Sequence, residues 1–224
     1  MASYQLNLAR LRNCPPVAAL AKAVAAFGLP KDEEFGVLSH SATDHAVFAT
    51  LVRKTQAAVT RLDEQTGEVT TAAVEKATVY PLAVKPRAEL LETYAGSETG
   101  LEQVGVFLAS CLQLPVVVEP IELDIPAALD KLARQAPKFQ LRSLRVSDYA
   151  HNSFMSGLYA PKFLDSQHGM EFLEEYADSA MAASVRFTAQ AGRATVTLRP
   201  KACFRFSCGE EDLAEVQSLL RKLT

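Results

Sequence analysis

The residue types best suited to catalysis gather between positions 149 and 162. A histidine next to serines is the pairing that nucleophilic catalysis uses, and the candidates here are His151, Ser153, Ser156, Tyr159 and Lys162. The stretch is rich in turn-forming residues, so we expect a long loop, and loops often carry function. A loop of this composition also brings serines near a histidine by chance. We keep a hydrolase that uses residues 149–162 as one alternative.

Other catalytic signatures are missing from the sequence. The chain has no Gly-x-Ser-x-Gly, Cys-x-x-Cys or His-Glu-x-x-His motif and no glycine-rich phosphate loop. The paired carboxylates Glu174 and Glu175 belong to the expected solvent face of a helix, where acid–base catalysis has no cleft to work in. We therefore predict no catalytic residue, and the sequence favours a protein that is not an enzyme.

Metal and disulfide patterns are weak. His40 and His45, with Asp44, fall at an expected strand–turn–strand junction, but a spacing of five without a nearby cysteine or glutamate is a poor metal motif. Cys203 and Cys208 are an odd number of residues apart, so they face opposite sides of a regular strand, Cys203 on the polar side and Cys208 on the core side. Four scattered cysteines do not form a disulfide framework. We predict neither a metal nor a cofactor.

A basic surface is the clearest functional signal. Three expected strands, 183–190, 193–199 and 202–208, alternate apolar and polar residues, which predicts one buried and one polar face. Together with an earlier strand, 139–147, and the preceding Lys138, these strands carry eight basic side chains and no acidic one on the polar face. The predicted binding residues are Arg142, Arg145, Arg186, Arg193, Arg199, Lys201 and Arg205.

Several partners could use such a face. Arginine and threonine also suit a strand surface that is only solvated or paired within the molecule. Otherwise the face could bind an acidic protein surface, a second copy of the chain, or nucleic acid. An isoelectric point near 5.9 and the inward parity of the phenylalanines on these strands count against single-stranded nucleic acid, which stacks on exposed aromatics.

The first part of the chain is expected to mix strands with one clear helix. Residues 4–11 alternate as a strand, Pro15 and Pro16 open a helix with an apolar stripe, and Gly28 ends it. Strands are then expected at 35–41, 46–54, 56–62 and within 69–84, with a hairpin turn at 63–68 and a short helix at 87–94.

The later elements surround the predicted binding strands. We expect a helix at 101–112 that is apolar nearly all round, and so lies in the core or in a subunit interface. A strand at 116–123 and a helix at 126–134, capped by Asp124, follow. A helix capped by Asp165 or Ser166 runs to about residue 177. The closing helix, 210–223, has an acidic first turn and a basic last turn, which complement the helix dipole.

Composition sets the class of protein. The chain has 224 residues, of which 49% are hydrophobic and 22% charged, with a net charge of −3, and these values exclude a disordered or fibrous chain. Its start lacks the pattern of a cleaved secretory signal. The uncharged run 104–118 is too short for a membrane span and contains a proline. We expect a cytoplasmic protein with no membrane partner.

The two ends of the chain share an element order. Each runs strand, helix, several antiparallel strands and helix, and the dipeptides Gln5-Leu6 and Gln140-Leu141 stand at matching points. This order is similar to the repeat of the TATA-binding-protein-like fold, a curved sheet with helices on its convex face, over about two thirds of the chain. No motif accompanies the similarity, so it assigns no functional residue.

The sequence therefore predicts an α+β protein of two lobes of antiparallel sheet backed by helices. We expect an N-terminal lobe at 1–96, a hydrophobic connecting segment at 97–136 and a C-terminal lobe at 137–224. The predicted role is a non-enzymatic binding or assembly protein that uses the arginine- and threonine-rich sheet face to bind an acidic protein or a second copy of itself. The alternatives are a saddle-like nucleic-acid-binding module and the hydrolase named above.

Overall fold

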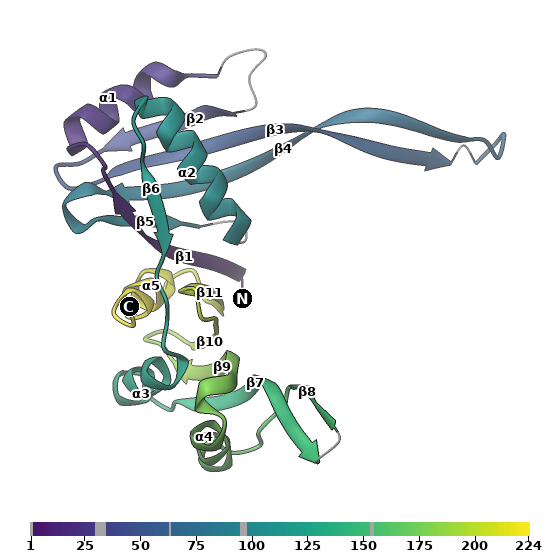
Figure 1. Cartoon of the computed structure of the whole chain (residues 1–224), viewed down its shortest axis with the longest axis vertical. Coiled ribbons are helices and arrows are strands. Elements are labelled where there is room, and N and C mark those ends of the chain that lie inside the picture. Colours follow the sequence, from purple (N-terminus) through teal and green to yellow (C-terminus); the bar gives the residue numbers. More distant parts are fainter. Residues whose placement is uncertain (1, 30–34, 63, 95–97, 153–154) are drawn as a thin grey trace. The chain divides into compact units, whose positions relative to one another are not determined.

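The computed structural model describes residues 2–29, 35–62, 64–94, 98–152 and 155–224 (Figure 1). In these ranges the chain forms five α-helices and eleven strands in an open antiparallel sheet, which confirms the mixed α+β class. Two compact units share the chain. The first, here the terminal unit, comprises Met1–Arg10, Glu92–Leu101 and Glu119–Thr224, and the second, here the central unit, comprises Leu11–Leu91 and Glu102–Val118.

The terminal unit is built on a six-stranded section of sheet. In sheet order, its strands are β1 (Ala2–Arg12), β11 (Cys203–Cys208), β10 (Arg193–Leu198), β9 (Ala180–Thr188), β7 (Gln140–Asn152) and β8 (Met155–Tyr159). Leu6 pairs with Phe204 and Val196 with Phe206, so the large apolar side chains of neighbouring strands meet on one face. The predicted C-terminal meander is thereby confirmed.

Three helices contact this section of sheet. They are α3 (Ile125–Gln135) against β9, α4 (Ser166–Glu175) against β7 and α5 (Leu213–Arg221) against β11. Asp124 caps α3 by accepting a hydrogen bond from the Ala127 N–H, and Asp165 caps α4, as the sequence predicts. The buried stripes of the helices and the buried side of the strands form the core, which includes Leu129, Leu173, Val185, Val196, Phe204, Phe206, Val216 and Leu220.

The central unit has a smaller section of sheet. Its order is β2 (Phe35–Ala42), β3 (Val47–Leu62), β4 (Val69–Lys85), β5 (Leu90–Thr93) and the end of β1. Helix α1 (Val17–Phe27) contacts β2 and β3, and α2 (Glu98–Leu112) places Phe107 against Phe27 and Phe35. Strand β6 (Val117–Pro120) follows α2 and pairs with β1.

Strands β3 and β4 continue far beyond their neighbours. They pair over 16 residue pairs, from Val47–Val84 to Leu62–Val69, whereas the described part of β2 pairs with β3 only as far as Arg53. Past that point the two strands form a ribbon that extends away from α1 and α2 (Figure 1). We call residues 54–62 and 69–77 of this ribbon the arm.

Three predicted elements of the chain are wrong. The expected break between the strands at 54 and 56 is absent, because β3 runs continuously through Thr55. The expected helix at 87–94 is instead a short 3-10 helix (η1, Pro86–Ala88) followed by strand β5. The expected loop at 149–161 is largely a hairpin, since β7 reaches Asn152 and β8 begins at Met155.

The apolar helix α2 is buried on one side only. Leu101, Val104, Phe107 and Leu108 are buried, but Val106 is 59% exposed. The expected core location therefore holds for one side of α2 only, which is the ordinary contact of a surface helix, and the alternative of a subunit interface stays a prediction. Within the described ranges, every helix falls short of the length and hydrophobicity that a membrane span requires.

Candidate functional site

The outward side of the sheet in the terminal unit carries arginines on neighbouring strands. Residues of β9 and β10 alternate between buried and accessible positions. Arg186 pairs with Thr195 and Arg205 with Thr197, so these side chains share one side of the sheet. We call this surface the basic face. It consists of Arg145, Arg186, Arg193, Arg199, Lys201 and Arg205, with the hydroxyl side chains Ser143, Ser184, Thr188, Thr195, Thr197 and Ser207.

A β-bulge brings β7 into this arrangement. Leu141 pairs with Val185 but Ser143 pairs with Ser184, so Arg142 is an extra residue without a partner in β9. Gln140, which pairs with Arg186, and Arg145 are an odd number of residues apart and would face opposite sides of a regular strand. Because the bulge shifts the alternation by one residue, Arg145 lies on the basic face as well. Arg142 itself is half-buried, and its carbonyl accepts a hydrogen bond from the Phe163 N–H at 2.8 Å.

The basic face is hollowed where β7, β9 and the β10–β11 turn lie close. A concavity of about 700 Å³ is lined by Arg145, Arg199 and Lys201 and by three hydroxyl side chains, those of Ser143, Ser184 and Thr197. Guanidinium groups and hydroxyls are donors that suit a carboxylate or a phosphate, and a guanidinium can bind either with two parallel hydrogen bonds. This arrangement can therefore hold an anionic group against the sheet.

A second, smaller concavity lies on the same face. It has a volume of about 290 Å³ and is lined by Lys138, Gln140, Arg186, Thr188 and Arg193, with part of Phe187. Lys138 adopts a left-handed backbone conformation just before β7, with φ of 52°. Lys138 is one of the eight basic residues counted from the sequence, but the predicted binding set does not include it.

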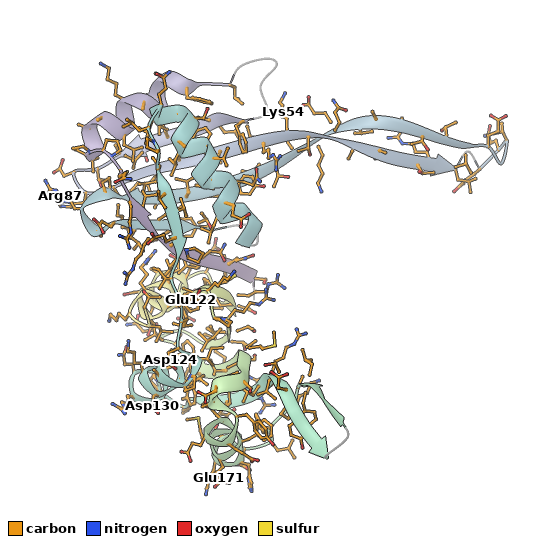
Figure 2. The ribbon with its side chains drawn as sticks, in the orientation of Figure 1. Lys54, Arg87, Glu122, Asp124, Asp130 and Glu171 are labelled. Atoms are coloured by element: carbon orange, nitrogen blue, oxygen red, sulfur yellow. The ribbon has the colours of Figure 1, made fainter. Side chains whose placement is uncertain are left out.

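The charges of the basic face are accessible. Arg145, Arg193, Arg199 and Arg205 are exposed, and Arg186 is half-buried. Among the described residues, no carboxylate lies within ion-pair distance of these five arginines. Acidic side chains such as Asp130 and Glu171 belong to helices α3 and α4 (Figure 2). The outward strands of the terminal unit thus gather arginines, whereas α4 carries Glu171, Glu174 and Glu175 and no lysine or arginine, a separation that the net charge of −3 conceals.

The stretch predicted as a catalytic loop forms other contacts. His151 lies in β7, Tyr159 ends β8, and Lys162 is exposed next to a single bridge with Ser143. Ser153 lies outside the described residues, and Ser156 belongs to β8. The ring of Tyr159 stacks on Tyr149 with centroids 4.4 Å apart.

That stacked pair belongs to a cluster that sequence reasoning missed. Five aromatic rings from β7, β8, α4 and the segment before α4 lie with neighbouring centroids 4.4–6.3 Å apart, namely Tyr149, Tyr159, Phe163, Phe172 and Tyr176. The spacing of Phe172 and Tyr176, four residues apart on a helix, was the available signal. The cluster holds the β7–β8 hairpin to α4 and is only partly buried.

The cysteines of β11 are buried, whereas His40 and His45 lie at the surface. Cys203 is buried beside β1, where its thiol donates to the Asn7 side-chain oxygen at 2.7 Å, and the Asn7 amide donates to Thr93 at 3.0 Å. Cys208 is buried as well, which agrees with its predicted core parity. His40 and His45 are exposed. Within the described part of the chain, no group of three His, Cys, Asp or Glu side chains could hold a metal ion.

Comparison with known proteins adds no further identification. No protein-family model matches the chain, and no curated protein matches its sequence.

Proposed function

We propose that this protein is a non-enzymatic binding or assembly protein whose basic face binds an acidic surface of another protein. One observation carries the proposal, namely the convergence of Arg145, Arg199 and Lys201 with three hydroxyl side chains on a single concavity. The half-buried Arg186 on β9 and the exposed Arg193 on β10 and Arg205 on β11 extend the positive surface beyond it.

The energetics favour a broad contact over a single strong pair. An exposed ion pair contributes only about 0–1 kcal/mol, because water and salt screen it. Several arginines held on one rigid sheet add their attraction and speed the encounter with an oppositely charged surface. We therefore expect affinity that depends on several basic residues together and that falls as salt rises.

Nucleic acid is the second candidate. Guanidinium and hydroxyl groups also make most protein contacts to phosphate oxygens, and the saddle-like arrangement suggested by the element order would present them to a duplex. Against single strands, the basic face offers no exposed aromatic side chain among the described residues, so it has no platform on which bases can stack. We therefore prefer an acidic protein surface over nucleic acid as the partner, and the experiment below distinguishes these two candidates.

The test compares an acidic peptide with DNA. Fluorescence anisotropy measures binding of polyglutamate, a DNA duplex and a DNA single strand at low and at high salt. The double variant Arg145→Glu/Arg199→Glu reverses two charges on the larger concavity. Its matched control, Arg134→Glu/Lys222→Glu, makes the same change of net charge at exposed positions at the ends of α3 and α5.

We expect polyglutamate to bind wild type and control alike, and the concavity variant to lose at least about tenfold in affinity, because like charges then face each other. Tighter binding of the DNA duplex, with a steep salt dependence that the concavity variant abolishes, would favour the second candidate. Failure of the wild-type protein to bind any of the three at low salt would contradict both.

A further inference from the structure

The arm exposes apolar side chains on both of its sides. Leu62 and Val69, the last pair before the turn, are 63% and 64% exposed, and Val59 and Val74 are also exposed. The arm has nine residue pairs, so its length is about 30 Å. A two-stranded ribbon is at best marginally stable in water when nothing packs on it. The arm is therefore built to contact something beyond its own unit.

Charge along the arm is ordered. Near its base, Lys54 forms an ion pair with Glu75 at 3.0 Å, and Figure 2 shows Lys54 where the ribbon leaves the body of the central unit. Residues 57–60 and 71–74 carry no charge. The turn carries Glu64 and Glu68 around Gly67, whose φ of 69° suits the tight reversal. Neither glutamate has an ion-pair partner among the described residues.

Nucleic acid does not fit this arm. Residues 53–78 contain four basic and four acidic side chains, so the ribbon has no net positive charge. Its outer end is acidic, and that end would meet the phosphates first if the arm entered a groove. A partner complementary to the arm would have basic residues where the tip docks and apolar residues next to them.

The basic face has that chemistry. Arg145 and Arg199 on the larger concavity are guanidinium donors for carboxylates. The same concavity is lined by Met181, which is 42% exposed, and by the small apolar residues Ala160 and Ala182. These apolar groups match Leu62 and Val69 on the arm, and the arginines match Glu64 and Glu68. Charge and apolar surface are thus complementary in kind.

We propose that the arm of one copy of this chain docks its acidic tip on the basic face of a second copy. The inference rests on the proposed function, since it names the acidic partner of that face. Tip and face are different surfaces, so after one contact the pair still offers one tip and one face. These either meet each other in a closed two-fold dimer or continue head-to-tail into a ring or a filament.

Sedimentation velocity on the full-length protein at increasing concentration tests this proposal. The tip variant is Glu64→Arg/Glu68→Arg, and its matched control is Glu210→Arg/Glu211→Arg, an exposed acidic pair before α5. The face variant is Arg145→Glu/Arg199→Glu. Wild type and control are expected to associate reversibly, less at high salt. Tip and face variants alone should raise the dissociation constant about 100-fold, because like charges then meet across the contact.

An equimolar mixture of the tip and face variants is the decisive sample. A basic tip then meets an acidic face, and the acidic tip of the other copy meets a basic face, so association is expected to return. A mixture that stays monomeric, or a tip variant that associates like wild type, overturns the proposal. A wild-type chain that stays monomeric but binds polyglutamate through its basic face also overturns it and leaves the proposed function standing. Loss of polyglutamate binding as well removes both.

Discussion

Arg221 on α5 donates two hydrogen bonds to the carboxylate of Glu92 on β5, from Nε to Oε1 at 2.9 Å and from Nη2 to Oε2 at 2.8 Å. Glu92 is fully buried, whereas the Arg221 side chain is 29% exposed. Tyr94 adds a third hydrogen bond by donating its hydroxyl to Glu92 Oε2 at 2.6 Å. Burial alone would lower the pKa of Arg221, but its hydrogen bonds and its attraction to Glu92 raise that pKa, so the guanidinium stays charged.

Replacing Arg221 should destabilise the terminal unit strongly. Arg221→Met removes the guanidinium that donates two hydrogen bonds to the buried Glu92 carboxylate, and removing one partner of a buried ion pair costs about 3–5 kcal/mol. The double variant Arg221→Met/Glu92→Leu should recover much of that loss, because no buried charge remains. Urea denaturation measures both, with Lys222→Met at the exposed neighbouring position as the control. A single variant as stable as the control would contradict this account.

The contacts of Tyr94 with Glu92 predict that the stability of the protein falls at alkaline pH. Burial, followed by the hydrogen bond and negative charge of Glu92, raises the pKa of Tyr94 from 10.0 to about 12. A raised pKa means that the fold favours the neutral phenol, so this contribution to stability is complete below pH 10 and is lost as pH rises through about 12. The difference in phenolate absorbance between wild type and Tyr94→Phe reports Tyr94 alone, and it should titrate near pH 12. A difference that titrates near 10 would refute the prediction.

The stability that Asp165 and His168 contribute at the start of α4 should depend on pH. The Asp165 side chain contacts His168 Nδ1 at 2.5 Å, and this hydrogen bond lowers the pKa of Asp165 and raises that of His168. The Asp165 contribution is present above its ordinary pKa of 3.8 and is lost as pH falls through the depressed value. The His168 contribution is present below its ordinary pKa of 6.5 and is lost as pH rises through the raised value.

NMR titration of the His168 ring checks this window. Asp165→Asn should return the pKa of His168 toward 6.5, since the first two causes of its rise both involve Asp165. Glu171→Gln is the matched control and should lower that pKa much less, because Glu171 adds only the third and smallest of the raising contributions. An Asp165→Asn titration curve identical to that of wild type would exclude the pairing in solution.

Asp212 should stabilise the turn between β9 and β10 through one oxygen only. Its Oδ1 accepts a hydrogen bond from the Ala191 N–H at 2.8 Å, while its buried Oδ2 has no partner among the described atoms. Asp212→Ala should cost about 1–3 kcal/mol, because it leaves the N–H without an acceptor. Asp212→Asn keeps the acceptor and should cost less. Thermal unfolding compares the two, and equal losses would count against this role.

The C-terminal meander was predictable because its signal is local. The strand segments 183–189, 193–198 and 204–208 alternate between apolar and polar residues, and Arg193 and Ala194 already fix which side of the sheet faces the core. Capping by Asp124 and Asp165 is equally local, since each carboxylate reaches N–H groups two or three residues ahead. The basic residues of the candidate site could therefore be identified before any coordinates.

Other features depend on partners far away in sequence. Leu90, Leu91 and Glu92 have good helix propensity, yet tertiary pairing makes them a strand. The partner of Glu92 is Arg221, which follows it by 129 positions, and the residues around Glu92 do not predict this ion pair. The two halves of the arm were recognised as strands, but no local pattern reveals that the described part of β2 pairs with β3 only as far as Arg53, before the arm begins. The concavities likewise arise from several strands at once.

The extra residue of β7, Arg142, has no partner in β9. Deleting Arg142 would let Ser143 follow Leu141 in unbroken alternation, opposite Ser184 where it already lies, so the later side chains would keep their sides of the sheet. Leu144 and Val146 would stay buried, and Arg145 would stay on the basic face. A one-residue deletion at this point is therefore expected to cost little more stability than Arg142→Ala.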